Sequence, residues 1–359
     1  MEATKTAART IDQVWSKRPL IISGPCSAET EEQVMETATQ LASTGKIDAL
    51  RAGIWKPRTR PGSFEGIGTK GLAWLQQARK VTGLPLAVEV ATGKQVEDAL
   101  HFDVDILWIG ARTTVNPFSV QEVADALRGV KVPVLIKNPI NPDLELWIGA
   151  AERVAKSGIE NIGLIHRGFS SYGNTEYRNA PMWHLAIEMK RRNPGMMMIC
   201  DPSHISGRRD ILQAVAQKSL DLDYDGLMIE SHVDPDNAWS DAKQQITPAK
   251  LAELLDGLHW RREMVEEAAP VLEKLREQIN QIDDELMQLL SQRMKIADNI
   301  GQFKKDNNIT ILQTNRWNEI LEKAFRKGEK LGLTKEFIVK YFDAVHMESI
   351  NHQNNIMNS

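Results

Sequence analysis

Eight short apolar runs, whose starts are about 20 to 37 residues apart, limit the possible folds of this sequence more than any other feature. Apolar runs of this length, without strict alternation, are typical of parallel strands buried on both faces. The intervals between the runs are long enough for crossover helices. The runs are LIISGPC, ALRAGIWK, LAVEV, ILWIGAR, VLIK, IGLIHR, MMMICDPSH and GLMIESH.

Helical patterns lie between these runs, so the first part of the chain alternates strands with helices. Every run ends at a charged or metal-capable residue. This favours an α/β class (β/α)₈ barrel over an open doubly wound sheet, because an open sheet gathers such residues mainly at one switch point. The carboxyl ends of all eight strands then meet on one face. The expected helices cover residues 30–44, 71–81, 120–129, 146–158, 206–218 and 247–258.

After Gly257 the pattern becomes entirely helical. We expect a barrel domain at residues 1–257, a charged linker at 258–270 and a helical domain at 271–359. The first helix of that domain carries a heptad seam, and two helices are expected at 313–329 and 334–355. Three helices make a small core, so we expect the domain to dimerise. The seam consists of Leu272, Leu275, Ile279, Ile282, Leu286, Leu289, Arg293, Ile296, Ile300 and Phe303.

Composition excludes several classes of protein. A net charge of −4 gives no basic excess to attract nucleic acid. No run approaches the ~20 apolar residues of a membrane span. Two cysteines cannot form a disulfide framework, and the first residues contain no hydrophobic signal segment. We therefore expect a cytoplasmic protein that binds neither nucleic acid nor membrane.

Four residues at neighbouring strand ends suit a divalent metal ion. They combine a thiol, an imidazole and two carboxylates, a mixed set that fits manganese, iron or zinc. Each residue alone is more often a core or loop residue, but their shared location favours a metal site. Cys200 is interpreted as core packing. The expected ligands are Cys26, His204, Glu230 and Asp241.

Six cations follow the ends of four other strands. Their convergence on one barrel mouth is unfavourable unless a polyanion lies among them. Two phosphorylated substrates satisfy this requirement most simply. Pro57 and Pro61 would stiffen the loop that presents some of these groups. The cations are Arg51, Lys56, Arg58, Arg112, Lys137 and Arg167.

The same residues closely resemble the compact type I beta form of 3-deoxy-D-arabino-heptulosonate 7-phosphate synthase. This resemblance implies condensation of phosphoenolpyruvate with erythrose 4-phosphate, the first step toward the aromatic amino acids. An octulosonate-phosphate synthase is the alternative within the barrel, although the KPRT loop speaks against it. The resemblance rests on GPCSAE, RAGIWKPRTRPGSFEG, GARTT, IKN, HRG, DPSHISG, MIESH and SDAKQQI.

The resemblance also implies roles for individual residues. It assigns the four expected metal ligands to a divalent ion, with manganese first and iron, cobalt or zinc as alternatives. Lys56 is the expected proton donor to the new alkoxide, with a metal-bound water as its competitor. Glu89 is expected to orient a lysine or arginine. Phosphoenolpyruvate is assigned to Arg51, Lys56, Arg112, Lys137 and Arg167, erythrose 4-phosphate to Lys56, Arg58 and Thr59, and further substrate contacts to Pro57 and Ala111.

In the helical domain, Arg293 interrupts the apolar seam. It either pairs with an anion or lies at the seam edge and reaches solvent. Arg276 and Lys304 are 28 positions apart on one helix, roughly 42 Å. If both contact one small ligand, Arg276 must come from a second, antiparallel copy. Other candidate contacts are Arg316, Ser349 and Gln353.

This domain resembles the all-helical class of chorismate mutase, which converts chorismate to prephenate. The resemblance places Lys304 and Gln353 at the ether oxygen. Gln313 and Trp317 stand where that family commonly has acidic residues. The alternative is a module that mainly senses chorismate or prephenate and dimerises, with prephenate as the expected inhibitor. The carboxylates are assigned to Arg276, Arg293 and Arg316, and Ser349 to substrate binding.

Overall fold

The computed structural model describes residues 11–56, 62, 64–172, 176–261 and 269–358. The chain divides into two compact units, Met1–Glu263 and Met264–Ser359. Within the described ranges no helix is both long enough and apolar enough to cross a membrane. The expected boundary at 258–270 lies partly outside the described residues and stays a prediction.

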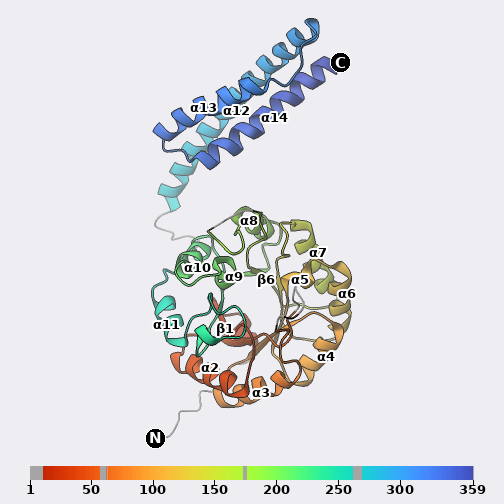
Figure 1. Cartoon of the computed structure of the whole chain (residues 1–359), viewed down its shortest axis with the longest axis vertical. Coiled ribbons are helices and arrows are strands. Elements are labelled where there is room, and N and C mark those ends of the chain that lie inside the picture. Colours follow the sequence, from red (N-terminus) through yellow and green to blue (C-terminus); the bar gives the residue numbers. More distant parts are fainter. Residues whose placement is uncertain (1–10, 57–61, 63, 173–175, 262–268, 359) are drawn as a thin grey trace. The chain divides into compact units, whose positions relative to one another are not determined.

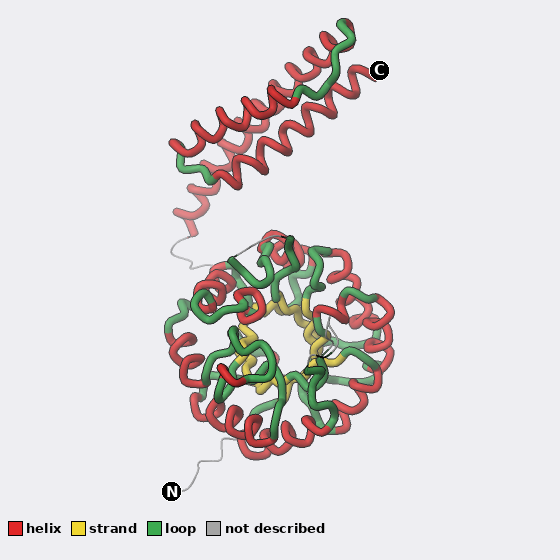
Figure 2. The backbone as a smooth tube through the Cα atoms, in the orientation of Figure 1, coloured by secondary structure: helices red, strands yellow, loops and turns green. Residues whose placement is uncertain are grey.

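The first unit is a closed barrel of eight parallel strands. The strands are paired in chain order, and β1 also pairs with β8. Figure 2 shows the strands as an inner ring surrounded by helices. The predicted (β/α)₈ fold is therefore confirmed. The strands are β1 Leu20–Gly24, β2 Ala49–Ala52, β3 Leu86–Val90, β4 Ile106–Ile109, β5 Val134–Lys137, β6 Ile162–His166, β7 Met197–Cys200 and β8 Gly226–Glu230.

Helices cover the outside of the barrel (Figure 1). The sequence patterns missed α4 and α8, and the helix predicted at 206–218 begins too early, because the structure starts it at Leu212. Gly207, with a φ of 65°, ends one short helix, and the next begins at Leu212. The helices of this unit are α1 Ile11–Trp15, α2 Glu31–Thr44, α3 Lys70–Thr82, α4 Gly93–His101, α5 Ala111–Thr114, α6 Pro117–Ala126, α7 Leu144–Lys156, α8 Trp183–Arg192, α9 Pro202–Ser206, α10 Leu212–Asp221, the 3₁₀ helix η1 Pro235–Asn237 and α11 Pro248–Asp256.

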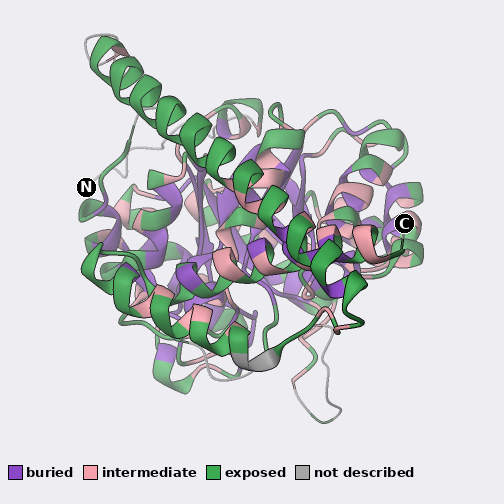
Figure 3. Cartoon of the chain, turned by 90° about the horizontal axis from the view of Figure 1, so that it is seen from above, coloured by how far each residue is buried: buried purple, intermediate pink, exposed green. Residues whose placement is uncertain are grey.

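The strands separate two apolar cores, and their alternation determines which way the charged strand ends face. Ala49, Leu135 and Met228 belong to the core inside the barrel, whereas their strand neighbours pack against the helices. Two residues further along each strand the side chain faces inward again. Arg51, Lys137 and Glu230 therefore face the interior at the carboxyl-terminal end of the barrel. Figure 3 shows the strands as largely buried.

His166, at the end of β6, is a buried histidine whose surroundings favour its neutral form. The Tyr224 hydroxyl lies 3.0 Å from its Nδ1, and Nε2 lies 2.7 Å from the carbonyl oxygen of Pro181. A ring that accepts from Tyr224 and donates to Pro181 satisfies both nitrogens without a charge. Burial, together with the nearby Arg167, lowers the pKa of His166 to about 4.

This lowered pKa predicts a pH-dependent stability of the barrel. Because the folded pKa lies below the unfolded one, the contribution is complete above about pH 6.5 and is lost as the pH falls toward 4. Between pH 7.5 and pH 5 we expect a loss of about 2 kcal/mol of unfolding free energy. Urea unfolding of wild type and His166→Phe checks this, because the variant should lose most of that pH dependence. Tyr224→Phe keeps the imidazole and should retain it; an unchanged slope in His166→Phe would contradict the prediction.

The second unit consists of three helices, α12 Ala269–Asp306, α13 Thr314–Lys330 and α14 Lys335–Asn358. α14 packs against both other helices. Among the described residues of this unit, only three hydrophobic side chains are buried, those of Ala297, Ile338 and Val345. The apolar seam of α12 is instead largely exposed. Exposed seam residues are Leu272, Leu275, Ile279, Ile282, Leu286, Leu289, Ile296, Ile300 and Phe303.

Candidate functional site

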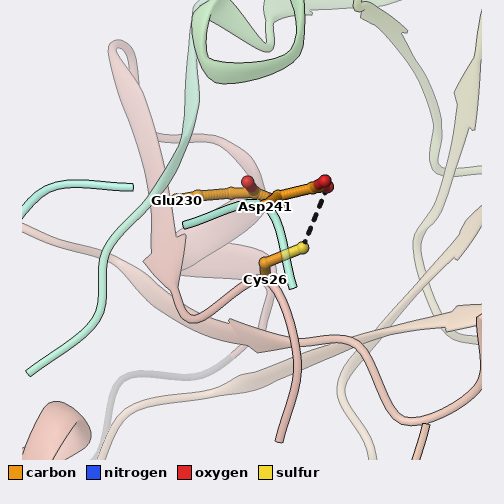
Figure 4. A group of neighbouring side chains, drawn as sticks. All are labelled: Cys26, Glu230 and Asp241. Atoms are coloured by element: carbon orange, nitrogen blue, oxygen red, sulfur yellow. Dashed lines mark hydrogen bonds between the residues drawn. The ribbon is translucent and has the colours of Figure 1, made fainter. Parts of the chain in front are cut away.

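Three predicted metal ligands form one cluster at the carboxyl-terminal face of the barrel. Cys26 follows β1, Glu230 ends β8, and Asp241 lies in the loop after β8. Their ligand atoms all lie within 4.8 Å of one another. Cys26 Sγ donates a hydrogen bond to Asp241 Oδ2 at 3.3 Å (Figure 4). This geometry brings a thiol and two carboxylates to one point.

His204, the fourth predicted ligand, lies beside this cluster on α9. Its Nε2 is 3.8 Å from Glu230 Oε1 and 4.0 Å from Asp241 Oδ2. Its Nδ1 is 2.8 Å from Asp201 Oδ2, so Asp201 helps to fix the orientation of the ring. Burial lowers the pKa of His204, although Asp201 and Glu230 oppose the shift. A neutral imidazole is the form that binds metals.

The residues present fit a divalent ion. Glu230 Oε1 is buried and accepts no hydrogen bond within the described ranges, although Arg51 Nη2 lies 3.3 Å away, so the oxygen keeps its acceptor capacity for a metal ion. Burial raises the pKa of Asp241, but His204, Arg178 and Lys56 outweigh it and lower that pKa overall. Lys56 Nζ donates to Cys26 Sγ at 2.7 Å, so an ammonium group already neutralises part of this anionic cluster.

Two adjacent glutamines support the cluster from behind. Gln244 Nε2 donates to Glu230 Oε2 at 2.7 Å, and Gln245 Oε1 accepts from the backbone N–H of Cys26 at 2.9 Å. Both residues are buried. They belong to the SDAKQQI motif, so the sequence signal existed, but their role was not predicted.

Arg51 and Lys137 face the barrel interior next to the cluster. Arg51 Nη2 lies 3.3 Å from Glu230 Oε1, and Lys137 Nζ lies 2.8 Å from Asp201 Oδ2. The cations are thus partly balanced by carboxylates of the chain itself, which the sequence argument did not anticipate. Arg51 Nε and Nη1 are nevertheless buried without a partner among the described residues. These donors are therefore free to bind an anionic ligand.

Arg167 is the buried cation that is least compensated. Its side chain donates to the Asn179 Oδ1 at 2.7 Å, and its backbone N–H donates to Asn138 Oδ1 at 2.7 Å. Within the described part of the chain, no carboxylate forms an ion pair with it. Burial, with Arg178 and Arg112 nearby, lowers its pKa to about 10. A buried guanidinium held by neutral amides is a strong anion site.

Trp108 lies beneath two cations of the site, a contact that was not predicted from the sequence. Its ring centroid lies 5.0 Å from Arg51 Cζ and 5.8 Å from Lys137 Nζ, and both cations lie over the ring. Its Nε1 donates to Glu89 Oε2 at 3.0 Å. Glu89 therefore bonds to this indole rather than directly to a lysine or arginine. Gly110 makes room for the carboxylate, because a Cβ there would lie 2.0 Å from Glu89 Oε1.

Of the remaining predicted substrate contacts in the barrel, the structure describes two residues and leaves three undescribed. Ala111 is buried and begins α5, whereas Arg112 on the same turn is exposed. Pro57, Arg58 and Thr59 lie outside the described residues. The erythrose phosphate contacts assigned to them therefore stay predictions.

In the helical unit, α12 and α14 bring four predicted site residues together. Arg293 donates to the hydroxyl of Ser349, and Lys304 Nζ donates to Gln353 Oε1 at 3.0 Å. Burial lowers the pKa of Lys304. The half-buried Arg293 thus contacts the α14 face, and no acidic partner binds it within the described ranges.

Arg276 and Arg316 do not join this group in a single copy of the chain. Arg276 pairs with Glu273 at 2.6 Å, and Arg316 pairs with Glu319 at 2.8 Å; all four side chains are exposed. Next to Arg316, Trp317 stacks on His346 with ring centroids 4.2 Å apart. Trp317 was singled out from the sequence, whereas its histidine partner was not.

The closed barrel, with buried cations and a group of metal-capable side chains at its carboxyl-terminal face, defines the class of the first unit, a (β/α)₈ barrel of the kind that carries enzyme active sites at this face. Residues 6–267 match the DAHP synthetase I family, and residues 275–354 match chorismate mutase type II. The chain belongs to the DAHP synthetase I family and carries a chorismate mutase type II domain behind the barrel. Both resemblances noted in the sequence are confirmed, as is the prediction of an enzyme that joins these two families.

Many curated proteins are similar to this chain, including the following two. The phospho-2-dehydro-3-deoxyheptonate aldolase of Thermotoga maritima is 33% identical over 226 residues, which are 63% of this chain and 64% of that protein. The 2-dehydro-3-deoxyphosphooctonate aldolase of Desulfotalea psychrophila is 30% identical over 277 residues, covering 71% of this chain and 94% of that protein. The chain thus spans less than two thirds of the length of the Thermotoga relative.

Solved structures agree with the fold. The crystal structure of phospho-2-dehydro-3-deoxyheptonate aldolase from Thermotoga maritima aligns with a TM-score of 0.59 and 30% identity, covering 66% of this chain and 67% of that one. A truncated form of 3-deoxy-D-arabino-heptulosonate 7-phosphate synthase from the same organism aligns with a TM-score of 0.56 and 29% identity, covering 66% and 84%.

Proposed function

We propose that the barrel condenses phosphoenolpyruvate with erythrose 4-phosphate to give 3-deoxy-D-arabino-heptulosonate 7-phosphate and inorganic phosphate. The observation that carries this proposal is the buried cation set of Arg51, Lys137 and Arg167, which lies beside the Cys26, Glu230 and Asp241 cluster. The cations suit the phosphate and carboxylate of phosphoenolpyruvate. Their fixed positions also stabilise charge that moves to the leaving phosphate.

The proposed reaction balances without a redox partner. C3 of phosphoenolpyruvate forms a bond to the aldehyde carbon, water supplies the oxygen at C2, and phosphate leaves. A divalent ion held by Cys26, His204, Glu230 and Asp241 would polarise the aldehyde oxygen, with manganese as our first choice and iron, cobalt or zinc as alternatives. Lys56, whose Nζ lies 2.7 Å from Cys26 Sγ, is placed to donate the proton to the new hydroxyl oxygen.

Lys56→Met is the direct test of this site. We expect synthase turnover to fall by about 100-fold or more, because a general acid contributes roughly that much. Phosphoenolpyruvate binding, measured by calorimetry, should largely survive, since Arg51, Lys137 and Arg167 remain. Lys46→Met, which replaces a half-buried lysine paired with Asp256, is the matched control and should keep wild-type turnover. Near-normal turnover of Lys56→Met would exclude the proposed role.

The aldehyde substrate needs its own measurement, because the curated relatives include octulosonate-forming enzymes. An eight-carbon product requires a five-carbon aldose phosphate in place of erythrose 4-phosphate. The KPRT motif favours the four-carbon sugar. Comparing kcat/KM for the two aldehydes decides, and a preference for the five-carbon sugar would replace this part of the proposal.

For the helical unit we propose the rearrangement of chorismate to prephenate in a homodimer. Arg293 and Arg316 would bind the carboxylates together with Arg276 of a second copy, while Lys304 and Gln353 contact the ether oxygen and Ser349 assists. An exposed apolar seam on a 38-residue helix, with so few buried hydrophobic side chains in the unit, supports association through α12.

A second role of this unit is sensing. Gln313 and Trp317 stand where acidic residues are common in the resembled family, and Trp317 stacks on His346 instead, which favours ligand binding with reduced turnover. We propose prephenate as the inhibitor that this unit recognises, acting on the barrel through differential binding.

We also propose a cytoplasmic location. Two free buried cysteines, Cys26 and Cys200, support a reducing compartment.

A further inference from the structure

His346 lies on the same face of α14 as the two predicted ligand contacts of that helix. The positions of His346, Ser349 and Gln353 are separated by three and four residues, so their side chains follow one stripe. Ser349 accepts from Arg293, and Gln353 accepts from Lys304. The backbone carbonyl of Val345, next to His346, also accepts from Arg293 at 3.3 Å. The imidazole therefore stands one helical turn from the Arg293 contact.

The ring of His346 has an unused polar atom. Its Nε2 is covered from solvent and has no hydrogen-bond partner among the described residues. The ring stacks on Trp317 at an interplanar angle of 17°, so the indole fixes its plane. A buried nitrogen without a partner is unfavourable in a folded protein unless a ligand or water completes it.

The charged groups around His346 favour an uncharged imidazole. Burial, and then Arg293 and Lys304, lower the pKa of His346, while Asp343 opposes them. A neutral ring offers one N–H donor and one acceptor nitrogen. The arginines and the lysine of the site bind anionic and ether oxygens, whereas a neutral imidazole matches an alcohol, which is both donor and acceptor.

We infer that His346 binds the ring hydroxyl of chorismate and that Trp317 is the positioning residue that holds the imidazole in place. This inference rests on the proposed chorismate site and deepens it. The stacked pair then compensates for the absence of acidic side chains at Gln313 and Trp317. In this chain a neutral histidine on α14 would bind the substrate alcohol, in place of the acidic residues that the resembled family commonly has at positions 313 and 317.

The test compares chorismate with an analogue in which hydrogen replaces the ring hydroxyl. In the full-length protein we expect wild type to prefer chorismate in kcat/KM by roughly 10-fold, because a site built for an alcohol discriminates against its absence. His346→Phe keeps an aromatic ring against Trp317 and should remove this preference. His346→Gln restores an uncharged hydrogen-bonding group and should recover part of it. Calorimetric affinities for both compounds give the same comparison if turnover is low.

The control is His352→Phe on the same helix, because His352 binds Asp298 and lies off the stripe. It should leave the preference unchanged. If His346→Phe lowers kcat/KM or affinity for both compounds by the same factor, the ring is only structural and the inference is wrong. If wild type neither converts nor binds chorismate, the proposed function of the helical unit fails with it, and that result is distinguishable from equal losses.

Discussion

Replacing Cys26 with Ala is expected to abolish measurable synthase turnover and to weaken divalent metal binding by more than about 100-fold. The thiol is the only soft donor in the cluster, and it lies 3.3 Å from Asp241 Oδ2. Without it, two carboxylates and one imidazole remain of the four proposed ligands. Substitution of residues that only hydrogen-bond to a metal ligand commonly lowers metal affinity or activity about 10–100-fold. Loss of the ligand itself should lower the metal affinity at least as much.

Metal binding should be measured separately from turnover, by competition with a chromophoric chelator. Cys200→Ala is the matched control, because Cys200 is equally buried but packs in the outer core between strands and helices. It should retain both metal and turnover. Full metal-dependent activity of Cys26→Ala would contradict the ligand assignment, and unchanged metal affinity with lost turnover would move Cys26 from binding to chemistry.

The sequence predicted the barrel and much of its mouth because both depend on strand periodicity. In a parallel barrel the residue at an inward position near the strand end must face the mouth, so Arg51, Lys137 and Glu230 were predictable from their place in each run. The distances between these three side chains could not be predicted in this way. Arg51 and Lys137 are paired with carboxylates of the chain itself, a relation between strands that no single run contains.

The residues that were not predicted make their contacts with residues far away in the sequence. Trp108 reads as one more apolar strand residue of β4. Its ring nevertheless lies under two cations, because Lys137 on the adjacent β5 and Arg51 on β2, two strands away, both face the barrel interior. Asn179 comes from the segment after β6 and links Arg167 to the carbonyl oxygen of His204. His346 carries no local signal at all, since only the packing of α13 against α14 brings Trp317 to it.

In the helical unit the sequence predicts contacts that a single copy of the chain does not make. The seam of α12 predicts a partner, and the structure of one chain leaves that seam exposed. Arg276 is near the start of α12, whereas Lys304 is near its end. Their separation is roughly 42 Å along the helix. If both contact one ligand, as we propose, Arg276 must come from a second chain.

Mixed dimers test this arrangement directly. Arg276→Ala and Lys304→Ala should each reduce mutase turnover by about 100-fold or more, since each removes a charge that is aimed at the reacting molecule. A heterodimer of the two variants, isolated through two different affinity tags, contains one site with all its residues and one site lacking both. By the symmetry of a twofold dimer it should recover about half of the wild-type turnover.

The control is Arg276→Ala carried on both tags, which should stay inactive after the same purification. Exchange of subunits would lower the recovered activity but would not create it in the parents. A heterodimer as inactive as either parent would show that Arg276 and Lys304 do not meet across two chains, whereas an Arg276→Ala protein with wild-type turnover would show that Arg276 plays no part. Recovery of activity, by contrast, requires that one catalytic centre be built from two chains, because neither parent chain alone contains a complete set.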